Sequence, residues 1–244
     1  GALLLAFLGW ASRHYGPLMP LSIFRLRTLS AANAAGFILG TALFSMFLIL
    51  TLYMQQVLGY SALETGFAYL AVAGTSVIWA NVAAQAVNRV GVKPALVFGM
   101  ALLTIGILTF TQVSVGGSYW VDLLPGFLII GLGMPFCFVP ITIAAVAGTK
   151  PEEAGLASGL INTSQQIGGA LGVAVLSTVA ISLTDDRLAS GVAQAQALTE
   201  GFQRAFWVGT AVALVGLIVS IVAVRASDIA PVSAGEPEPA PAAV

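Results

Sequence analysis

Six apolar stretches, each close to or above twenty residues long, fill the chain between Ala31 and Val224, and their interiors carry no charged side chain. A charged group at the centre of a bilayer costs at least about 2.5–3.5 kcal/mol. Only 8% of the residues are charged, whereas soluble domains contain about 25%. A water-soluble fold is therefore excluded, and the sequence predicts an all-α membrane protein with six transmembrane helices.

The predicted domains follow from where these stretches begin and end, since about 20 apolar residues of helix cross the hydrocarbon core. A six-helix bundle is expected over residues 31–225, after a cytoplasmic connection at 11–30. Residues 1–10 are apolar but too short for a span, and we interpret them as the remnant of a preceding helix and the chain as a fragment. A cleaved signal peptide is the alternative, although its positive n-region is missing. Residues 226–244 are rich in Pro, Ala and Glu and predict a disordered cytoplasmic tail. The expected spans are 31–57, 65–88, 94–113, 121–148, 155–183 and 205–224.

The charged residues predict how the bundle sits in the membrane, because basic residues near span ends collect on the cytoplasmic side. With a cytoplasmic tail, only Arg187 and Arg204 fall outside, in a long connection at 184–204. We therefore expect a multi-pass protein of the plasma membrane with its carboxy-terminal tail in the cytoplasm. The basic residues on the cytoplasmic side are then Arg13, Arg25, Arg27, Arg89, Lys93, Lys150 and Arg225.

The composition argues against several other functions. Nine basic residues in 244 are too few for nucleic-acid binding. Cys137 lies in an apolar stretch and His14 has no neighbouring ligands, so neither a metal site nor a cofactor is expected. Neither a Ser-His-Asp set nor a buried acid–base pair is recognisable, and the sequence does not predict an enzyme.

Amide side chains are unevenly distributed among the six stretches. The third and sixth contain nothing more polar than Ser or Thr over 95–109 and 206–224. Amides in hydrocarbon require protein partners or a water-filled cavity. We therefore expect the third and sixth helices to be peripheral, and the first, second and fifth to face an interior or a partner. This two-times-three pattern is typical of the internal repeats of secondary transporters.

Helical spacing groups these polar residues on faces. Asn81, Gln85 and Asn88 share one face of the second helix, and Ser158, Asn162 and Gln165 share one face of the fifth. The alternative interpretation is that each amide only joins helices, at about 0.6 kcal/mol per hydrogen bond. The candidates for a substrate pathway or a contact with another half are Asn33, Gln55, Asn81, Gln85, Asn162, Gln165 and Gln166.

Glycine and proline add two structural expectations. The fourth stretch contains Pro135 and Pro140 and should bend or break near Met134–Phe138, which makes Met134 and Phe136 further pathway candidates. Packing without a ligand is the alternative for both. Close helix contacts are expected at three small-xxx-small pairs, namely Gly36 with Gly40, Gly155 with Gly159, and Gly168 with Gly172.

Residues 153–172 read Glu-Ala-Gly-Leu-Ala-Ser-Gly-Leu-Ile-Asn-Thr-Ser-Gln-Gln-Ile-Gly-Gly-Ala-Leu-Gly. This segment closely resembles the penultimate helix of the fourteen-helix drug:proton antiporters of the major facilitator superfamily. Residues 20–25 and 52–61 are also similar to that branch. The tight turn with Asn88, Arg89, Gly91 and Lys93 resembles the second copy of the superfamily's loop motif, except that Asn88 replaces the usual Asp. Gating through this copy is therefore in doubt.

The resemblance implies that the chain is the carboxy-terminal half of a multidrug exporter that works by alternating access. It further implies that the first and fourth helices line a cavity and the second and fifth meet the other half. The implied partners are the lipid bilayer, a missing amino-terminal half and a small-molecule substrate, and the implied energy source is a proton gradient. No carboxylate lies deep in these six spans, so we expect the titrating residue in the missing part. An exporter of another small-molecule class, or a truncated membrane protein that does not transport, remains the alternative.

Overall fold

The computed structural model describes residues 27–147 and 153–223. The predictions for residues 1–26, for 148–152 and for the tail from 224 onward lie outside the described residues. Arg27 already belongs to the first helix, so this helix begins inside the connection that the sequence predicted for 11–30. Lys150, His14 and Arg225 are likewise outside the described part of the chain.

Six helical segments of membrane-spanning length confirm the predicted number of spans. The second span is divided at Tyr69, where α3 ends and α4 begins. A single-turn π-helix, η3, precedes α6, and a 3₁₀ turn, η2, follows α5. The elements are α2 (Arg27–Gln56), α3 (Ala62–Ala68), α4 (Leu70–Val90), α5 (Val92–Thr109), η2 (Phe110–Gln112), η3 (Tyr119–Leu123), α6 (Leu124–Val146), α7 (Ala154–Ala189) and α8 (Gln194–Ala223).

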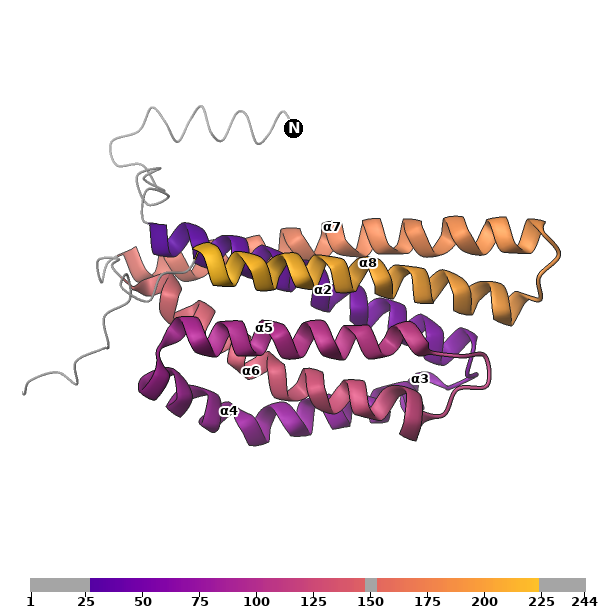
Figure 1. Cartoon of the computed structure of the whole chain (residues 1–244), viewed down its shortest axis with the longest axis horizontal. Helices are drawn as coiled ribbons and strands as arrows, with labels where there is room; N and C mark the ends of the chain where they lie inside the picture. Colours follow the sequence, from indigo (N-terminus) through magenta and orange to yellow (C-terminus); the bar gives the residue numbers. More distant parts are fainter. Residues whose placement is uncertain (1–26, 148–152, 224–244) are drawn as a thin grey trace, which may run out of the picture.

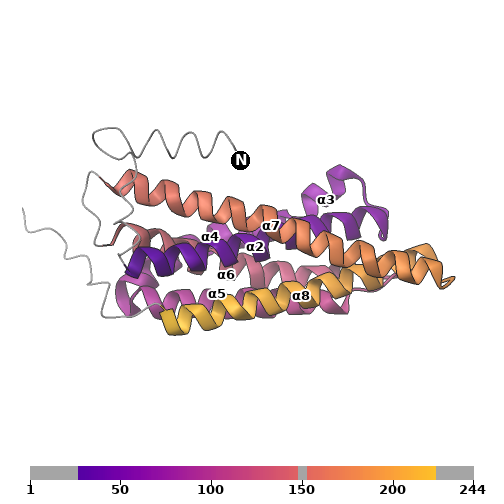
Figure 2. The same cartoon turned by 90° about the horizontal axis from the view of Figure 1, so that it is seen from above.

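The helices form two layers. In one layer α4 packs on α6, α6 on α2, and α2 on α7. In the second layer α5 and α8 pack on each other; α5 lies against α6, and α8 lies against α2 and α7. Figure 1 shows α8 crossing in front of α2 and α5 in front of α6, and the turned view in Figure 2 shows α7 and α8 converging toward the turn that joins them. Helices α5 and α8 cover only one side of the layer formed by α4, α6, α2 and α7. The other side of that layer is left open by the described helices.

The six spans differ in the share of their apolar 18-residue window that is buried. The third and sixth, expected to be peripheral, are more buried within the described residues than the second and fifth. The first and fourth spans are the most buried, at 56% each, and the second and fifth are the least, at 17% and 33%. The third and sixth, at 50% and 39%, form the second layer. Within residues 95–109 and 206–222 of these two helices the large exposed side chains are apolar, for example Phe98 and Ile105 on α5 and Leu214 and Ile218 on α8, as expected for helices that face lipid.

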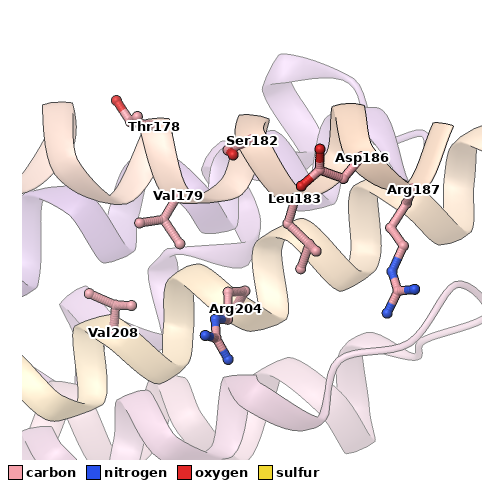
Figure 3. Close-up of a pocket in the computed structure, with 8 residues that line it drawn as sticks. All are labelled: Thr178, Val179, Ser182, Leu183, Asp186, Arg187, Arg204 and Val208. Atoms are coloured by element: carbon pink, nitrogen blue, oxygen red, sulfur yellow. The ribbon is translucent and has the colours of Figure 1, made fainter. Parts of the chain in front are cut away.

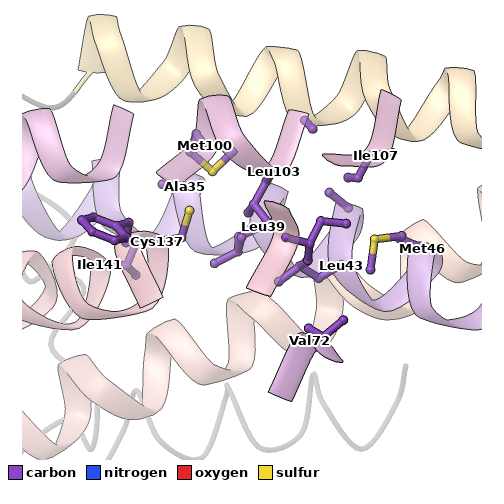
Figure 4. Packing of buried hydrophobic residues seen from close by; sticks show 14 of the residues in the cluster. Ala35, Leu39, Leu43, Met46, Val72, Met100, Leu103, Ile107, Cys137 and Ile141 are labelled. Carbon is purple, nitrogen blue, oxygen red and sulfur yellow. The ribbon is translucent and has the colours of Figure 1, made fainter. Parts of the chain in front are cut away.

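The core lies where α2, α5 and α6 meet. Leu39 and Leu43 of α2 pack near Met100 and Leu103 of α5, and the buried thiol of Cys137 comes from α6 (Figure 4). Close approach of α5 and α6 depends on Gly99, since a Cβ atom there would lie 2.6 Å from the backbone of Phe136. Small residues at such crossings let helix backbones touch where lipid supplies no hydrophobic driving force.

Helices α2 and α7 cross even more closely. A Cβ atom at Gly40 would overlap the carbonyl of Gln165, and one at Gly168 or Gly172 would overlap a carbonyl of α2. Thr41 Oγ1 donates to the carbonyl oxygen of Gly168 over 3.0 Å. Two of the three predicted small-residue pairs therefore form one helix–helix contact. The third pair, Gly155 and Gly159, has nothing within 4 Å of either Cβ position.

Two predictions about the course of the helices need correction. The chain between Thr184 and Arg204 was expected to be a long connection, but α7 continues to Ala189 and α8 begins at Gln194. Neither proline nor glycine interrupts α7 after Gly172, so the helix extends past the apolar region. In the fourth span, α6 remains an unbroken α-helix with both prolines inside it, because neighbouring helices support such a segment. The helix is therefore not broken near Met134–Phe138, and a bend there stays a prediction.

Candidate functional site

One face of α7 combines polar and small residues and has no described helix against it. Gly155, Gly159, Asn162 and Gln166 follow at intervals of three or four residues, and all four are exposed. This spacing places them on a single face. The opposite part of the α7 surface is apolar, with Ile167, Leu171 and Val175 exposed. Amides at this depth are not typical of a surface that faces hydrocarbon, so the polar face is the main candidate site.

Two other predicted site residues, Asn33 and Gln165, lie in the contact between α2 and α7. Asn33 is 8% exposed; its Nδ2 donates to the Leu29 carbonyl over 2.9 Å, and its Oδ1 accepts from Ser164 Oγ over 2.7 Å. Gln165 packs its side chain over Gly36. For Asn33, the structure therefore favours the alternative that the amide joins helices.

The polar face of α4 points away from its neighbours. Asn81, Gln85 and Asn88 are exposed, whereas Val72, Ala83 and Val87 on the opposite face are buried. Helix α4 packs on α6 and touches α5, and none of the three amides has a hydrogen bond that involves another described helix. The second span thus presents amides on the surface that its own bundle leaves open.

A cavity of about 340 Å³ lies at the end of the bundle that carries the α7–α8 turn, Ser190–Ala193. It lies between α2, α7 and α8 and is lined by Gln56, Ser177, Thr184, Asp185 and Phe202, among others. Along α7 the positions 162, 166, 170, 173, 177, 181 and 184 keep one face. The cavity is therefore in line with Asn162 and Gln166. The site residues predicted from the sequence did not include Gln56 or Asp185. Asp185 was assigned to a connection between helices. The helical pattern that continues without interruption from 173 to 189 could have placed it on α7.

Three further candidates are not part of this face. Gln55 is exposed at the end of α2. Met134 is half-buried, with its sulfur 4.0 Å from Ser76 Oγ of α4. Phe136 is 6% exposed and packs edge-on against Phe98, with ring centroids 5.1 Å apart. The structure thus places Phe136 in the contact between α5 and α6.

The turn between α4 and α5 is as tight as predicted. Gly91 has φ +91° and its N–H donates to the Val87 carbonyl over 2.9 Å. Asn88 and Arg89 are exposed beside it, and Lys93 is half-exposed. In Figure 1 this turn lies at the end where α2 begins, opposite the α7–α8 turn. Arg89 and Lys93, beside this turn, therefore lie at the opposite end of the bundle from Arg187, which lies near the end of α7.

Comparison with known families identifies this helix arrangement. The family model described as Major Facilitator Superfamily matches residues 2–173. The chain belongs to the Major Facilitator Superfamily.

Relatives within this superfamily include proteins named for drug resistance. The chain is 34% identical over 228 residues to the puromycin resistance protein pur8 of Streptomyces alboniger, a match that covers 90% of the chain and 44% of that protein. It is 32% identical to the tetracenomycin C resistance and export protein of Streptomyces glaucescens, over 76% of the chain and 35% of the relative. Identity to the multidrug resistance protein Stp of Mycobacterium tuberculosis is 30%, over 68% and 31%. The chain thus spans less than half the length of these relatives.

The family match and the six apolar helices indicate a multi-pass membrane protein of the Major Facilitator Superfamily in a lipid environment. Within the described residues, no group of three or more His, Cys, Asp and Glu side chains could hold a metal ion. The polar groups of the site are amides, hydroxyl groups and the carboxylate of Asp185. Such groups can bind and release a solute through hydrogen bonds.

Proposed function

We propose that this chain is the carboxy-terminal half of a proton-coupled exporter of drugs or similar small apolar molecules that works by alternating access. In this proposal the exposed polar faces of α7 and α4 meet an amino-terminal half and border the solute pathway. The tail and the α4–α5 turn lie in the cytoplasm, and the α7–α8 turn lies outside. The activity is transport and not catalysis.

The observation that carries the proposal is the uncovered polar face of α7. Gly155 and Gly159 have nothing within 4 Å of their Cβ positions, and Asn162 and Gln166 are exposed beside them. At two more glycines of the same helix, Gly168 and Gly172, the space beside the glycine is already occupied by α2. A helix with small residues on two faces fits two close neighbours, and one of those neighbours is not among the described helices.

Names of the relatives support the substrate class. All three relatives above are named for drug resistance, and one is also named for export. An exporter of another small-molecule class is the second candidate, since the cavity beside Asp185 is lined by both polar and apolar side chains. Asp185, which lines this cavity, offers a carboxylate to a cationic drug.

The test is Gln166→Leu in the complete transporter, with drug accumulation measured at equal expression. We expect weaker efflux with unchanged insertion, because Leu removes the amide from the pathway or from the contact between halves. Gln112→Leu is the matched control, since Gln112 is exposed in η2 outside this face. Equal efflux by the Gln166→Leu variant and the unmodified transporter would contradict the proposal.

A second test concerns the contact itself. Gly159→Leu adds bulk where the described helices leave open space, so the 244-residue chain should fold as before. In the complete transporter the same change should prevent the two halves from packing and abolish efflux. We also expect no drug gradient in vesicles that contain the 244-residue chain alone, because alternating access requires both halves.

A further inference from the structure

The second span is bent at Tyr69, near the end of the bundle that is the outer end in the proposed orientation. Tyr69 separates α3 from α4, and its ψ of −11° departs from the value of about −42° in a regular α-helix. Hydrogen bonds still cross the bend. The Tyr69 N–H donates to the Thr65 carbonyl over 3.3 Å, and the Ala73 N–H donates to the Tyr69 carbonyl over 3.1 Å. The backbone is therefore bent but continuous, so α3 can change its angle without a break in the span.

Helix α3 is short and has little packing. Its main contacts are with α2 and α4, and its buried residues are Thr65 and Ala68. Leu63 and Phe67 are 70% and 61% exposed, and a Cβ atom at Gly66 would meet no described atom within 4 Å. In Figure 2, α3 projects from the bundle on the side opposite α8. Elements that move in function are drawn from such parts, which have few buried contacts.

Tyr69 is the fixed point of the bend. Its Oη donates to the Phe47 carbonyl over 2.9 Å and lies 3.0 Å from Thr51 Oγ1, and both partners belong to α2. Its ring centroid is 5.2 Å from that of Phe47 and 5.4 Å from that of Phe127 on α6. Two hydroxyl contacts and two aromatic neighbours therefore hold this residue against α2 and α6, independently of α3.

A second tyrosine holds the end of α3. Tyr119 Oη donates to the carbonyl oxygen of Ala68, the last residue of α3, over 3.1 Å. The last carbonyls of a helix have no partner within that helix, so this one accepts from another segment. Tyr119 begins η3, the π-helical turn before α6, and such turns are frequent at functional sites. In the described part of the chain, no other hydrogen bond joins α3 to a helix outside the second span.

The α7–α8 pair, which reaches the same end of the bundle, is joined by an ion pair. Arg187 Nε of α7 lies 2.6 Å from Glu200 Oε2 of α8. A groove of about 610 Å³ lies between these two helices, with Asp186 on α7 and Arg204 on α8 among its lining residues (Figure 3). Neither helix is a main contact of α3. A movement of α3 therefore leaves this pair intact.

We propose that α3 is a lid over the outer end of the solute pathway, that it swings about Tyr69, and that the hydrogen bond from Tyr119 to Ala68 holds it in the position seen in Figure 2. This inference rests on the proposed function, because α3 projects toward the side where the other half would lie. The lid closes the pathway when α3 contacts that half, and it opens when the hydrogen bond breaks. One hydrogen bond shifts such an equilibrium by roughly two- to tenfold, which is small enough to be reversed in each transport cycle.

Spin labels on the 244-residue chain test the hinge directly. One label is placed at Leu63→Cys on α3 and the other at Leu108→Cys on α5, since these positions are 70% and 39% exposed. Cys137 is buried and stays unlabelled. Double electron–electron resonance then gives the distribution of distances between the labels. We expect Tyr119→Phe to raise the population of displaced distances by roughly two- to tenfold, because it removes the hydroxyl that holds Ala68.

Two controls distinguish a hinge from a general loosening of the bundle. With the first label moved to Ile78→Cys on α4, which is 72% exposed, Tyr119→Phe should leave the distance distribution unchanged. Tyr60→Phe should leave both distributions unchanged. The Tyr60 hydroxyl makes no hydrogen bond within the described residues, and Tyr60 directly precedes Ser61, the N-cap of α3. The inference is wrong if Tyr119→Phe leaves the α3 distances unchanged, if it broadens the α3 and α4 distances alike, or if Tyr60→Phe has the same effect.

Drug efflux by the complete transporter tests the role of the lid. At equal expression, Tyr119→Phe should weaken efflux at least about twofold relative to Tyr60→Phe, since the outer end of the pathway is closed less often. Equal efflux by these two variants would overturn the lid even if α3 is displaced. If Gln166→Leu leaves efflux unchanged, the proposed contact with another half fails, whereas the spin-label distances still decide whether α3 swings about Tyr69.

Discussion

The contact between α2 and α7 predicts a large difference between two alanine substitutions on the same helix. At Gly168 a Cβ atom would overlap the Phe37 carbonyl oxygen and would lie 2.9 Å from its carbon and 3.0 Å from Thr41 Oγ1. At Gly159 a Cβ atom would meet nothing within 4 Å. In Gly168→Ala the helices must separate by roughly 0.5–1 Å, a gap that forfeits a quarter to a half of the attraction of each facing contact. The hydrogen bond from Thr41 to Gly168 lengthens as well.

Overpacking of this kind costs about 1–3 kcal/mol. Both variants gain helix propensity, about 0.5–1 kcal/mol, and this gain cancels when the two are compared. We therefore expect Gly168→Ala to be less stable than Gly159→Ala by about 1–3 kcal/mol. The measurement is unfolding of the 244-residue chain in mixed micelles by added SDS, followed by circular dichroism. Equal unfolding midpoints, or a less stable Gly159→Ala variant, would refute the packing argument.

Three further predictions concern other parts of the chain. Gly91→Ala should lower the free energy of unfolding by about 1–3 kcal/mol, because φ +91° with ψ 168° lies in a region open only to glycine. Thermal unfolding measures this against the control Gly116→Ala, since Gly116 has no positive φ and no close neighbour. Tyr53→Phe should lower the free energy of unfolding by about 0.5–1.5 kcal/mol, since the hydroxyl donates to the Ser114 carbonyl over 2.7 Å, and an unchanged SDS midpoint would contradict this. Asp185→Asn in the complete transporter should weaken drug efflux more than Asp122→Asn does, and an equal effect in an accumulation assay would argue against a role for the cavity.

The sequence by itself determined the class of the fold. Six uncharged stretches allow only helices across a bilayer, since every backbone polar group must be satisfied within its own segment. The amides of α4 and α7, and the absence of amides from α5 and from residues 206–223 of α8, predicted which helices carry polar surfaces within the membrane. The structure confirms the exposed amide face of α4. Helical spacing was sufficient for this, because residues three and four apart share a face wherever the helix lies.

The tertiary structure alone decided what each polar or small residue contacts. Gly155 and Gly168 belong to equally good small-residue pairs in the sequence, but α2 covers only Gly168. Asn33 and Asn162 are both amides, yet one is buried against Ser164 and the other is exposed. Asp185 and Asp186 are adjacent, but they line different hollows on two sides of α7. A periodic pattern defines the faces of one helix, whereas the neighbour that covers each face is set by how all six helices pack together.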